Sequence, residues 1–200
     1  MRPVKAALIA GATLLAIAYY GKTTQRVNDT SNSAVTNLVG GTINFFNGGA
    51  MQISNNGRAQ IERREGYRNT VYADVAGNQT AGIGHLLTRA DGYNIGDYVA
   101  DTVIQSWFNS DISHVENIMA RYITVPLNQN QIDALGSAVF NLGSRLFINA
   151  DGSKTHILAD LISGNMQAAA AQLPLWDHAG GVTVPGLYAR RVAEMNQFLA

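Results

Sequence analysis

Three residues near the middle of the sequence have the types and spacing needed to cleave a glycosidic bond. They are Glu65, Asp74 and Thr80. Glycoside hydrolysis requires one protonated carboxyl group that donates its proton and a second, ionised one across the bond. Both carboxylates also have ordinary interpretations, Glu65 as a solvated charge in the run from Glu62 and Asp74 as a turn residue. The spacing alone is therefore suggestive only.

The elements that must position these residues follow from glycine placement and apolar spacing. A short helix is expected to end near Glu65, just before Gly66. The stretch 70–86 contains three glycines and β-favouring residues, which predicts a small antiparallel sheet with tight turns. Helical spacing dominates afterwards, so the predicted fold class is α+β, mostly helical, with the sheet beside a helical lobe and a cleft between them.

Several helix boundaries are also predicted. Thr102-x-x-Gln105 and Asn128-x-x-Gln131 have the pattern of capping boxes, and the helix that begins at Asn128 is expected to stop at Gly143. Further helices are expected at about 155–162, 165–173 and 187–199. Trp107 and Trp176 are interpreted as core residues because of their helical spacing.

The residues around the candidate carboxylates resemble the catalytic segment of phage lysozymes of the T-even type, which are family 24 glycoside hydrolases. The resemblance covers about residues 51–200, as a phage-lysozyme fold. It rests on Glu65-Gly66-Tyr67-Arg68, Tyr72-Ala73-Asp74, Thr80-Ala81-Gly82-Ile83-Gly84-His85-Leu86-Leu87, the segment from Val125 to Gly143, and Trp176 to Glu194.

The resemblance implies a muramidase that cleaves the β-1,4 bond between N-acetylmuramic acid and N-acetylglucosamine in peptidoglycan, for host lysis. By position, it makes Glu65 the general acid. Asp74 stabilises the developing oxocarbenium charge and, with Thr80, orients a water on the opposite face. Inverting members of the family imply carboxyl groups about 6.5–9.5 Å apart, and a general acid active near neutral pH implies a raised pKa for Glu65.

Further residues match family positions around the cleft. Leu86, Phe140 and Thr155 match positions that line the saccharide cleft, with ordinary core packing or a helix start as the alternative. His85 is expected to anchor the sheet to the helical lobe through an ion pair. Arg190 and Arg191 are expected to pair with buried or cleft carboxylates, and one of them with Glu65 when no substrate is bound.

The first 50 residues differ in composition from the rest. Residues 1–20 have a basic start and a weakly apolar, Ala- and Gly-rich run, which predicts a signal-anchor helix or a removable signal peptide; a buried Ala-rich helix is the alternative. Residues 21–50 read as a Gly/Asn/Ser/Thr-rich linker, and 51–200 as the lysozyme domain. The expected location is the host inner membrane, then the periplasm, as in signal-anchor-release endolysins.

Composition excludes other classes of protein. There is no cysteine, so thiolate catalysis and zinc–thiolate sites are excluded, and the histidines lie too far apart in sequence for a metal-dependent amidase. Residues 51–200 hold 10 basic and 13 acidic side chains, which argues against nucleic acid as a partner. We expect no metal or cofactor, a monomer, and peptidoglycan glycan strands and the inner membrane as partners. A virion-borne lysozyme that opens the wall for genome delivery, and an inactive peptidoglycan-binding module, stay open as alternatives.

Overall fold

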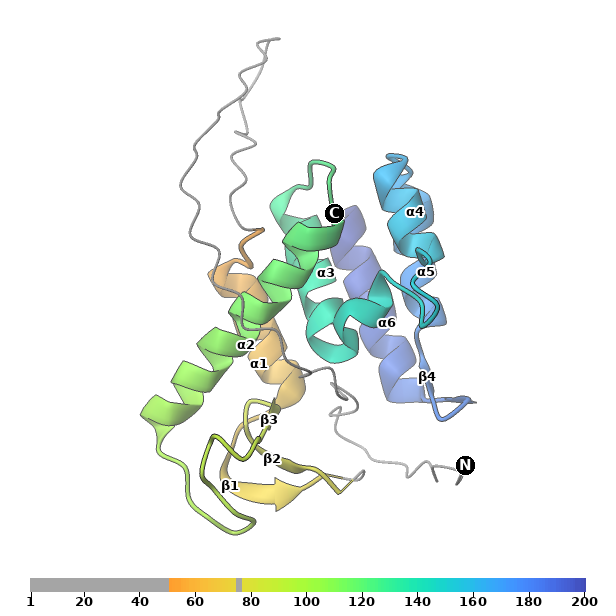
Figure 1. The fold of residues 1–200 in the computed structure, drawn as a ribbon. Helices are drawn as coiled ribbons and strands as arrows, with labels where there is room; N and C mark the ends of the chain where they lie inside the picture. The colour runs from red at the N-terminus through yellow and green to blue at the C-terminus, as the bar shows by residue number, and fades with distance from the viewer. Residues whose placement is uncertain (1–50, 75–76) are drawn as a thin grey trace.

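The computed structural model describes residues 51–74 and 77–200. The expected helix at 1–20 and linker at 21–50 lie outside the described residues. Within them the chain forms a small sheet lobe and a larger helical lobe, joined by the long helix α2 (Figure 1). The helices are α1 (Asn55–Glu65), α2 (Asp101–Tyr122), α3 (Gln129–Leu142), α4 (His156–Ile162), α5 (Met166–Gln172) and α6 (Pro185–Leu199), with two 3₁₀ turns, η1 (Gly143–Leu146) and η2 (Leu173–Leu175).

The sheet lobe is an antiparallel meander, as expected for the stretch 70–86. Its strands are β1 (Arg68–Ala73), β2 (Gln79–Gly82) and β3 (His85–Leu86), in the order β1-β2-β3. The strands are short, and the sheet is stabilised by packing against α2 rather than by its own hydrogen bonds alone. A second, two-stranded ribbon, β4 (His178–Ala179) and β5 (Val182–Thr183), precedes α6 and was not predicted from the sequence.

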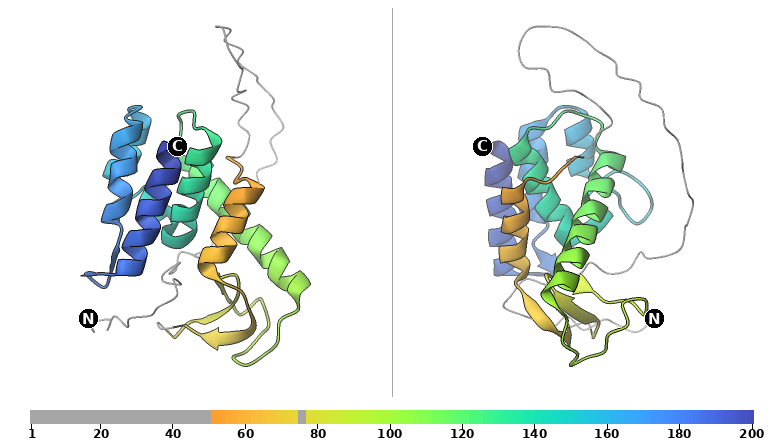
Figure 2. Two further views of the ribbon diagram at one scale, coloured as in Figure 1. Left: turned by 180° about the vertical axis from the view of Figure 1, so that it is seen from behind. Right: turned by 90° about the vertical axis from the view of Figure 1, so that its left-hand side faces the viewer.

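Helix α3 is the centre of the helical lobe. It packs against α1, α2 and α6, and seven consecutive residues of it, 133–139, are buried. Figure 2 shows α3 enclosed between these helices from two further directions. Its start is the capping box predicted at Asn128 and Gln131, and its end is the predicted Gly143, at φ 64°. A helix buried on several faces can fix the positions of residues on all the helices around it.

The expected start of α2 was wrong. The helix begins at Asp101 with Ala100 as its N-cap, and no side chain caps it, so Thr102 lies inside the first turn instead of ahead of it. Asp101 supplies a negative charge in that turn, which the helix dipole favours. The rest of the helix follows the predicted spacing, since Ile104, Phe108 and Ile112 are all buried.

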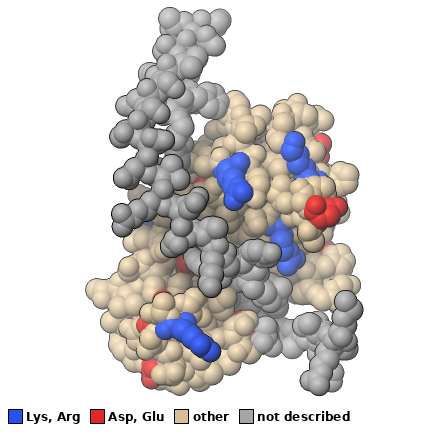
Figure 3. Space-filling model, viewed as in Figure 1, with Lys and Arg blue, Asp and Glu red and all other residues tan. Residues whose placement is uncertain are grey.

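The described surface carries scattered charge. On the face seen in Figure 3, the basic side chains of the described residues stand apart from one another over both lobes. Within the part of the chain that the structure describes, no helix has the length and apolar character needed to cross a membrane.

Candidate active site

Glu65 is the last residue of α1, and the start of that helix is fixed firmly to α3. The Ser54 hydroxyl caps α1 by accepting from the Gly57 N–H, and it donates to Asp133 of α3. The two helices approach so closely that a Cβ on Gly57 would lie 2.6 Å from the Asp133 carboxyl carbon. At the other end Gly66 terminates α1 with φ 77°, a left-handed conformation that glycine adopts readily. The position of Glu65 is therefore set by packing at the start of α1 and by the glycine that ends the helix.

The Glu65 carboxyl group is enclosed between α6 and the turn between β2 and β3. Its side chain is 3% exposed, and its Oε1 accepts a hydrogen bond of 2.8 Å from Nη1 of Arg190. Gly84, in the turn after β2, lies so close that a Cβ there would be 3.5 Å from Oε2. Of the two arginines expected near the carboxylates, Arg190 is the one that pairs with Glu65. Arg191 contacts Asn141 and Glu194 instead.

Burial and ion pairing act on Glu65 in opposite directions. Burial raises the pKa of Glu65, Arg190 lowers it by less, and the net pKa is above its ordinary value. At the other end of the pair, burial by itself would lower the pKa of Arg190, but Glu65 and Glu194 together raise it. Both directions hold because the repulsion from Glu194 adds to burial in raising the pKa of Glu65, whereas Arg190 has two carboxylates, Glu65 and Glu194, that offset its own burial. Glu65 therefore has the character of a carboxyl group that keeps its proton to higher pH than usual.

Asp74 has a different environment at the tip of the β1–β2 hairpin. Its carboxylate is half-buried and accepts two hydrogen bonds from Asn78, 2.8 Å from the backbone N–H to Oδ1 and 3.1 Å from the side-chain amide to Oδ2. The Asp74 N–H donates to the Asn78 carbonyl, which closes the turn. An acceptor of several hydrogen bonds is the role of an ionised carboxylate. The two candidate carboxyl groups thus have contrasting surroundings.

The strand register brings Thr80 to the same part of the hairpin. Thr80 pairs across the sheet with Tyr72 on β1 and with Leu86 on β3, and it is 2% exposed. Because Ala73 pairs with Gln79, Thr80 lies diagonally opposite Asp74, a separation of about 7–8 Å between backbone positions. Side chains two residues apart on one strand point to the same face of the sheet. Tyr72 pairs with Thr80, and Asp74 comes two residues after Tyr72, so Asp74 and Thr80 share a face.

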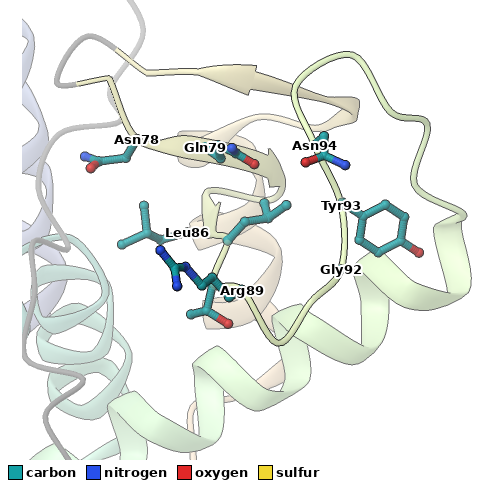
Figure 4. A pocket seen from close by; sticks show the side chains of 9 residues that line it. Asn78, Gln79, Leu86, Arg89, Gly92, Tyr93 and Asn94 are labelled. Carbon is teal, nitrogen blue, oxygen red and sulfur yellow. The ribbon is translucent and has the colours of Figure 1, made fainter.

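The three residues expected to line a saccharide cleft have three different surroundings. Leu86 borders a groove of about 560 Å³ in the sheet lobe. Figure 4 shows Asn78 and Gln79 on one side of it and the segment with Gly92, Tyr93 and Asn94 on the other. Glu65 is not among its described lining residues.

Phe140 and Thr155 lie in the helical lobe. The Phe140 ring packs edge-on against Phe108, 6.0 Å between centroids. Thr155 is the N-cap of α4: its hydroxyl accepts from the Leu158 N–H and donates to the Leu146 carbonyl. Thr155 also borders a smaller pocket of about 160 Å³ with Trp176. Phe140 therefore makes the contacts of the alternative interpretation as a core residue. Thr155 makes those of the alternative interpretation as the start of a helix.

Known proteins share both the sequence and this fold. The profile of the family described as phage lysozyme matches residues 62–194. The endolysin of Salmonella phage P22 is 38% identical over 132 residues, 65% of this chain and 86% of the relative. A crystal structure of a P22 lysozyme mutant covers 74% of this chain and 99% of its own, with 36% identity and a TM-score of 0.62. The SAR-endolysin of Escherichia phage Mu is 31% identical over 126 residues, 62% of this chain and 67% of the relative.

The chain belongs to the phage lysozyme family. As a member of this family it is a lysozyme, which is a glycosidase. Its similarity to endolysins indicates a peptidoglycan hydrolase that acts in host lysis. The matched segment contains both candidate carboxylates, Arg190 and the whole of the sheet lobe.

In this phage lysozyme, His85 joins the sheet lobe to α2. Its Nδ1 lies 2.9 Å from Oδ2 of Asp111, and its Nε2 is 3.8 Å from Oδ1 of Asp91. The imidazole also stacks on Trp107, with 4.5 Å between ring centroids and 16° between planes. These contacts have the form expected of a structural anchor. Trp107 and Trp176 are both partly buried and pack against the core.

Sequence reasoning missed a second buried carboxylate of this lysozyme, Glu194. Its side chain is completely buried and meets Arg64, Arg190 and Arg191. The available signal was the spacing of Arg190, Arg191 and Glu194, which are three and four residues apart on one helix and therefore neighbours. Among the described residues, no group of three or more His, Asp or Glu side chains is placed to hold a metal ion.

Proposed function

We propose that the chain hydrolyses the β-1,4 bond between N-acetylmuramic acid and N-acetylglucosamine, with Glu65 as the general acid. The observation that carries this proposal is the buried Glu65 carboxyl group with a raised pKa, facing the turn that follows β2 of the Asp74 hairpin. A glycosidase needs such a group because the leaving oxygen must be protonated at a pH where ordinary carboxyl groups are ionised.

Asp74 and Thr80 supply the other half of the proposed mechanism. The Asp74 carboxylate stabilises positive charge on the sugar ring, and with the Thr80 hydroxyl it holds the attacking water. Asn78 fixes the carboxylate through two hydrogen bonds, so little reorganisation is needed during the reaction. We infer an inverting outcome, with carboxyl groups about 6.5–9.5 Å apart, as in the T-even type of family 24.

Arg190 must release Glu65 in part when substrate binds. Its Nη1 donates to Oε1 of Glu65, while its other nitrogens are held by Glu194 and by the Ser137 carbonyl. A protonated Glu65 no longer attracts Arg190 as an ion, so protonation itself weakens the contact.

For delivery, we propose that residues 1–20 carry the chain to the inner membrane as a signal anchor and that 21–50 link it to the lysozyme domain. The support is the basic start and weakly apolar run of the sequence, together with the relative from phage Mu named as a SAR-endolysin. Mass spectrometry of the chain from lysing cells tests this. An intact chain that moves from the membrane to the soluble fraction agrees with release, whereas loss of the first 18 or so residues indicates cleavage.

The bond specificity is tested by digesting purified peptidoglycan with the chain and identifying the new reducing ends. Muramic acid at those ends is the expected result. Glucosamine ends would indicate a different glycosidase, anhydro-muramic ends a transglycosylase, and no new ends an inactive binding module. Presence of the chain in purified virions would favour a role in genome delivery.

A further inference from the structure

A buried cluster of charge lies where α1, α3 and α6 meet, directly behind Glu65. Three guanidinium groups and two carboxylates take part, and the cluster also includes the polar groups of Ser137 and Asn141. The charged members are Arg64 and Glu65 of α1, and Arg190, Arg191 and Glu194 of α6. Such a cluster is costly to bury, so stability alone is a weak explanation for it.

Glu194 is the centre of this cluster. Its Oε1 accepts from the Ser137 hydroxyl at 2.7 Å, from Nε of Arg190 at 3.1 Å and from Nη1 of Arg64 at 3.4 Å. Its Oε2 lies 3.1 Å from Nε of Arg191, close enough for an ion pair but without the alignment of a hydrogen bond. One fully buried carboxylate therefore meets all three arginines.

Arg190 connects the two carboxylates. Its Nη1 donates to Glu65, its Nε to Glu194 and its Nη2 to the Ser137 carbonyl, so every nitrogen of the guanidinium has a partner. The planar shape of the group fixes these directions relative to one another. Glu194 and Ser137 thus fix the position of the Arg190 guanidinium group relative to the Glu65 carboxyl group.

The balance of charge explains why a second carboxylate is needed. With Glu194 present, three guanidinium groups face two carboxylates, and Glu194 continues to meet all three when Glu65 takes up a proton. Without Glu194, Glu65 would be the sole anion among the described groups of the cluster. The buried Arg190 and Arg191 and the partly buried Arg64 would then favour the ionised form of Glu65, so a smaller fraction of the protein would carry the proton that is donated.

We propose that Glu194 is a positioning residue for the reaction: it anchors Arg190 and supplies the counter-charge that lets Glu65 keep its proton. This inference rests on the proposed role of Glu65 as the general acid. The electrostatics agree in sign, because burial raises the pKa of Glu65, Arg190 and Arg191 lower it, and Glu194 raises it. The same burial lowers the pKa of Arg191 to about 10, although Glu194 opposes that shift.

The test is Glu194→Gln in the full-length chain, with two readouts. The first is the pH profile of kcat and KM on purified peptidoglycan. The second is the titration of the Glu65 carboxyl carbon by ¹³C NMR, assigned by its loss in Glu65→Gln. Glu116→Gln is the matched control, since Glu116 is a buried carboxylate that accepts from the Ile53 N–H outside this cluster.

In Glu194→Gln we expect the Glu65 titration and the basic limb of kcat to move to lower pH by at least about one unit. That shift makes kcat roughly ten-fold lower above the limb, with KM little changed. Glu116→Gln should keep the wild-type limb. An unchanged Glu65 titration in folded Glu194→Gln would overturn the proposal, since a merely structural glutamate would lower only the melting temperature.

Two further outcomes keep the test decisive. Adding Arg191→Gln to Glu194→Gln removes one charge of each sign, so the basic limb of kcat should return toward its wild-type pH. This double variant also serves as the test if Glu194→Gln alone does not fold. If Glu65 in the double variant titrated at a pH far below that of the wild type, the proposed role of Glu194 as a counter-charge would be overturned. A shifted Glu65 titration with an unshifted kcat limb would support the role of Glu194 and instead refute Glu65 as the acid.

Discussion

Replacing Glu65 with glutamine should stabilise the protein at neutral pH while it removes the proposed acid. The Glu65 side chain is 3% exposed and its partner Arg190 is 4% exposed, so ionising Glu65 places charge in a poorly solvated site. The amide oxygen of glutamine can still accept from Nη1 of Arg190 at the position of Oε1. The variant therefore removes the cost of a buried charge without leaving Arg190 unpaired at this nitrogen.

The sign of the pH dependence follows from the raised pKa. Between the ordinary and the raised pKa the folded chain binds more protons than the unfolded chain, so stability falls as pH rises through this window. Below the ordinary value both states are protonated and no penalty exists. Each unit between the two pKa values costs the wild type about 1.4 kcal/mol, which is roughly 3–6 °C in Tm for a domain of this size.

The assay is thermal unfolding of wild type and Glu65→Gln from pH 3 to pH 8. The two curves should coincide at about pH 3, and the variant should become progressively more stable than the wild type as the pH rises toward 7. Glu62→Gln, one turn earlier on the same helix, is the control and should show no such trend. A variant that is less stable than wild type, by a gap that widens as pH rises, would refute the reasoning. It would show that Arg190 stabilises an ionised Glu65.

Two predictions concern how the helices are placed. Gly136→Ala should cost roughly 1–3 kcal/mol in unfolding free energy, because its Cβ would lie 2.6 Å from Cδ1 of Ile53; Gly186→Ala, with no atom within 4 Å, should be neutral or slightly stabilising. Equal effects by chemical denaturation would contradict the close approach at Gly136. Asn128→Ala should cost about 1 kcal/mol through loss of the α3 capping box, whereas Thr102→Ala, which caps nothing, should change stability by less than about 0.5 kcal/mol.

Local patterns predicted much of the fold because they act within a few residues. The capping box at Asn128, the glycine stop at Gly143 and the end of α1 at Glu65 all depend on neighbouring backbone groups. The start of α2 was wrong because Ala100 begins that helix without a side-chain cap. The ribbon β4–β5 was missed because each strand has only two residues and shows no alternation.

The site was predictable in its residues but not in its balance of charge. Glu65 and Asp74 could be found from the sequence because they belong to one short segment with a strong resemblance to a known family. The pairing of an arginine at 190 or 191 with Glu65 was expected, but the Glu194 cluster unites α1, α3 and α6, and the sequence separation of 130 residues between Arg64 and Glu194 hides their contact. The groove beside Leu86 likewise depends on how the segment 87–94 folds over β2 and β3.

The most direct test of the central claim is the rate at which Glu65→Gln releases muramic acid reducing ends from purified peptidoglycan. With a wild-type fold verified by circular dichroism, the variant should be slower by roughly 10²–10⁴-fold, the contribution of a general acid, while Glu62→Gln should keep the wild-type rate. A folded Glu65→Gln with a rate close to wild type would contradict the account, because the proton would then come from another group.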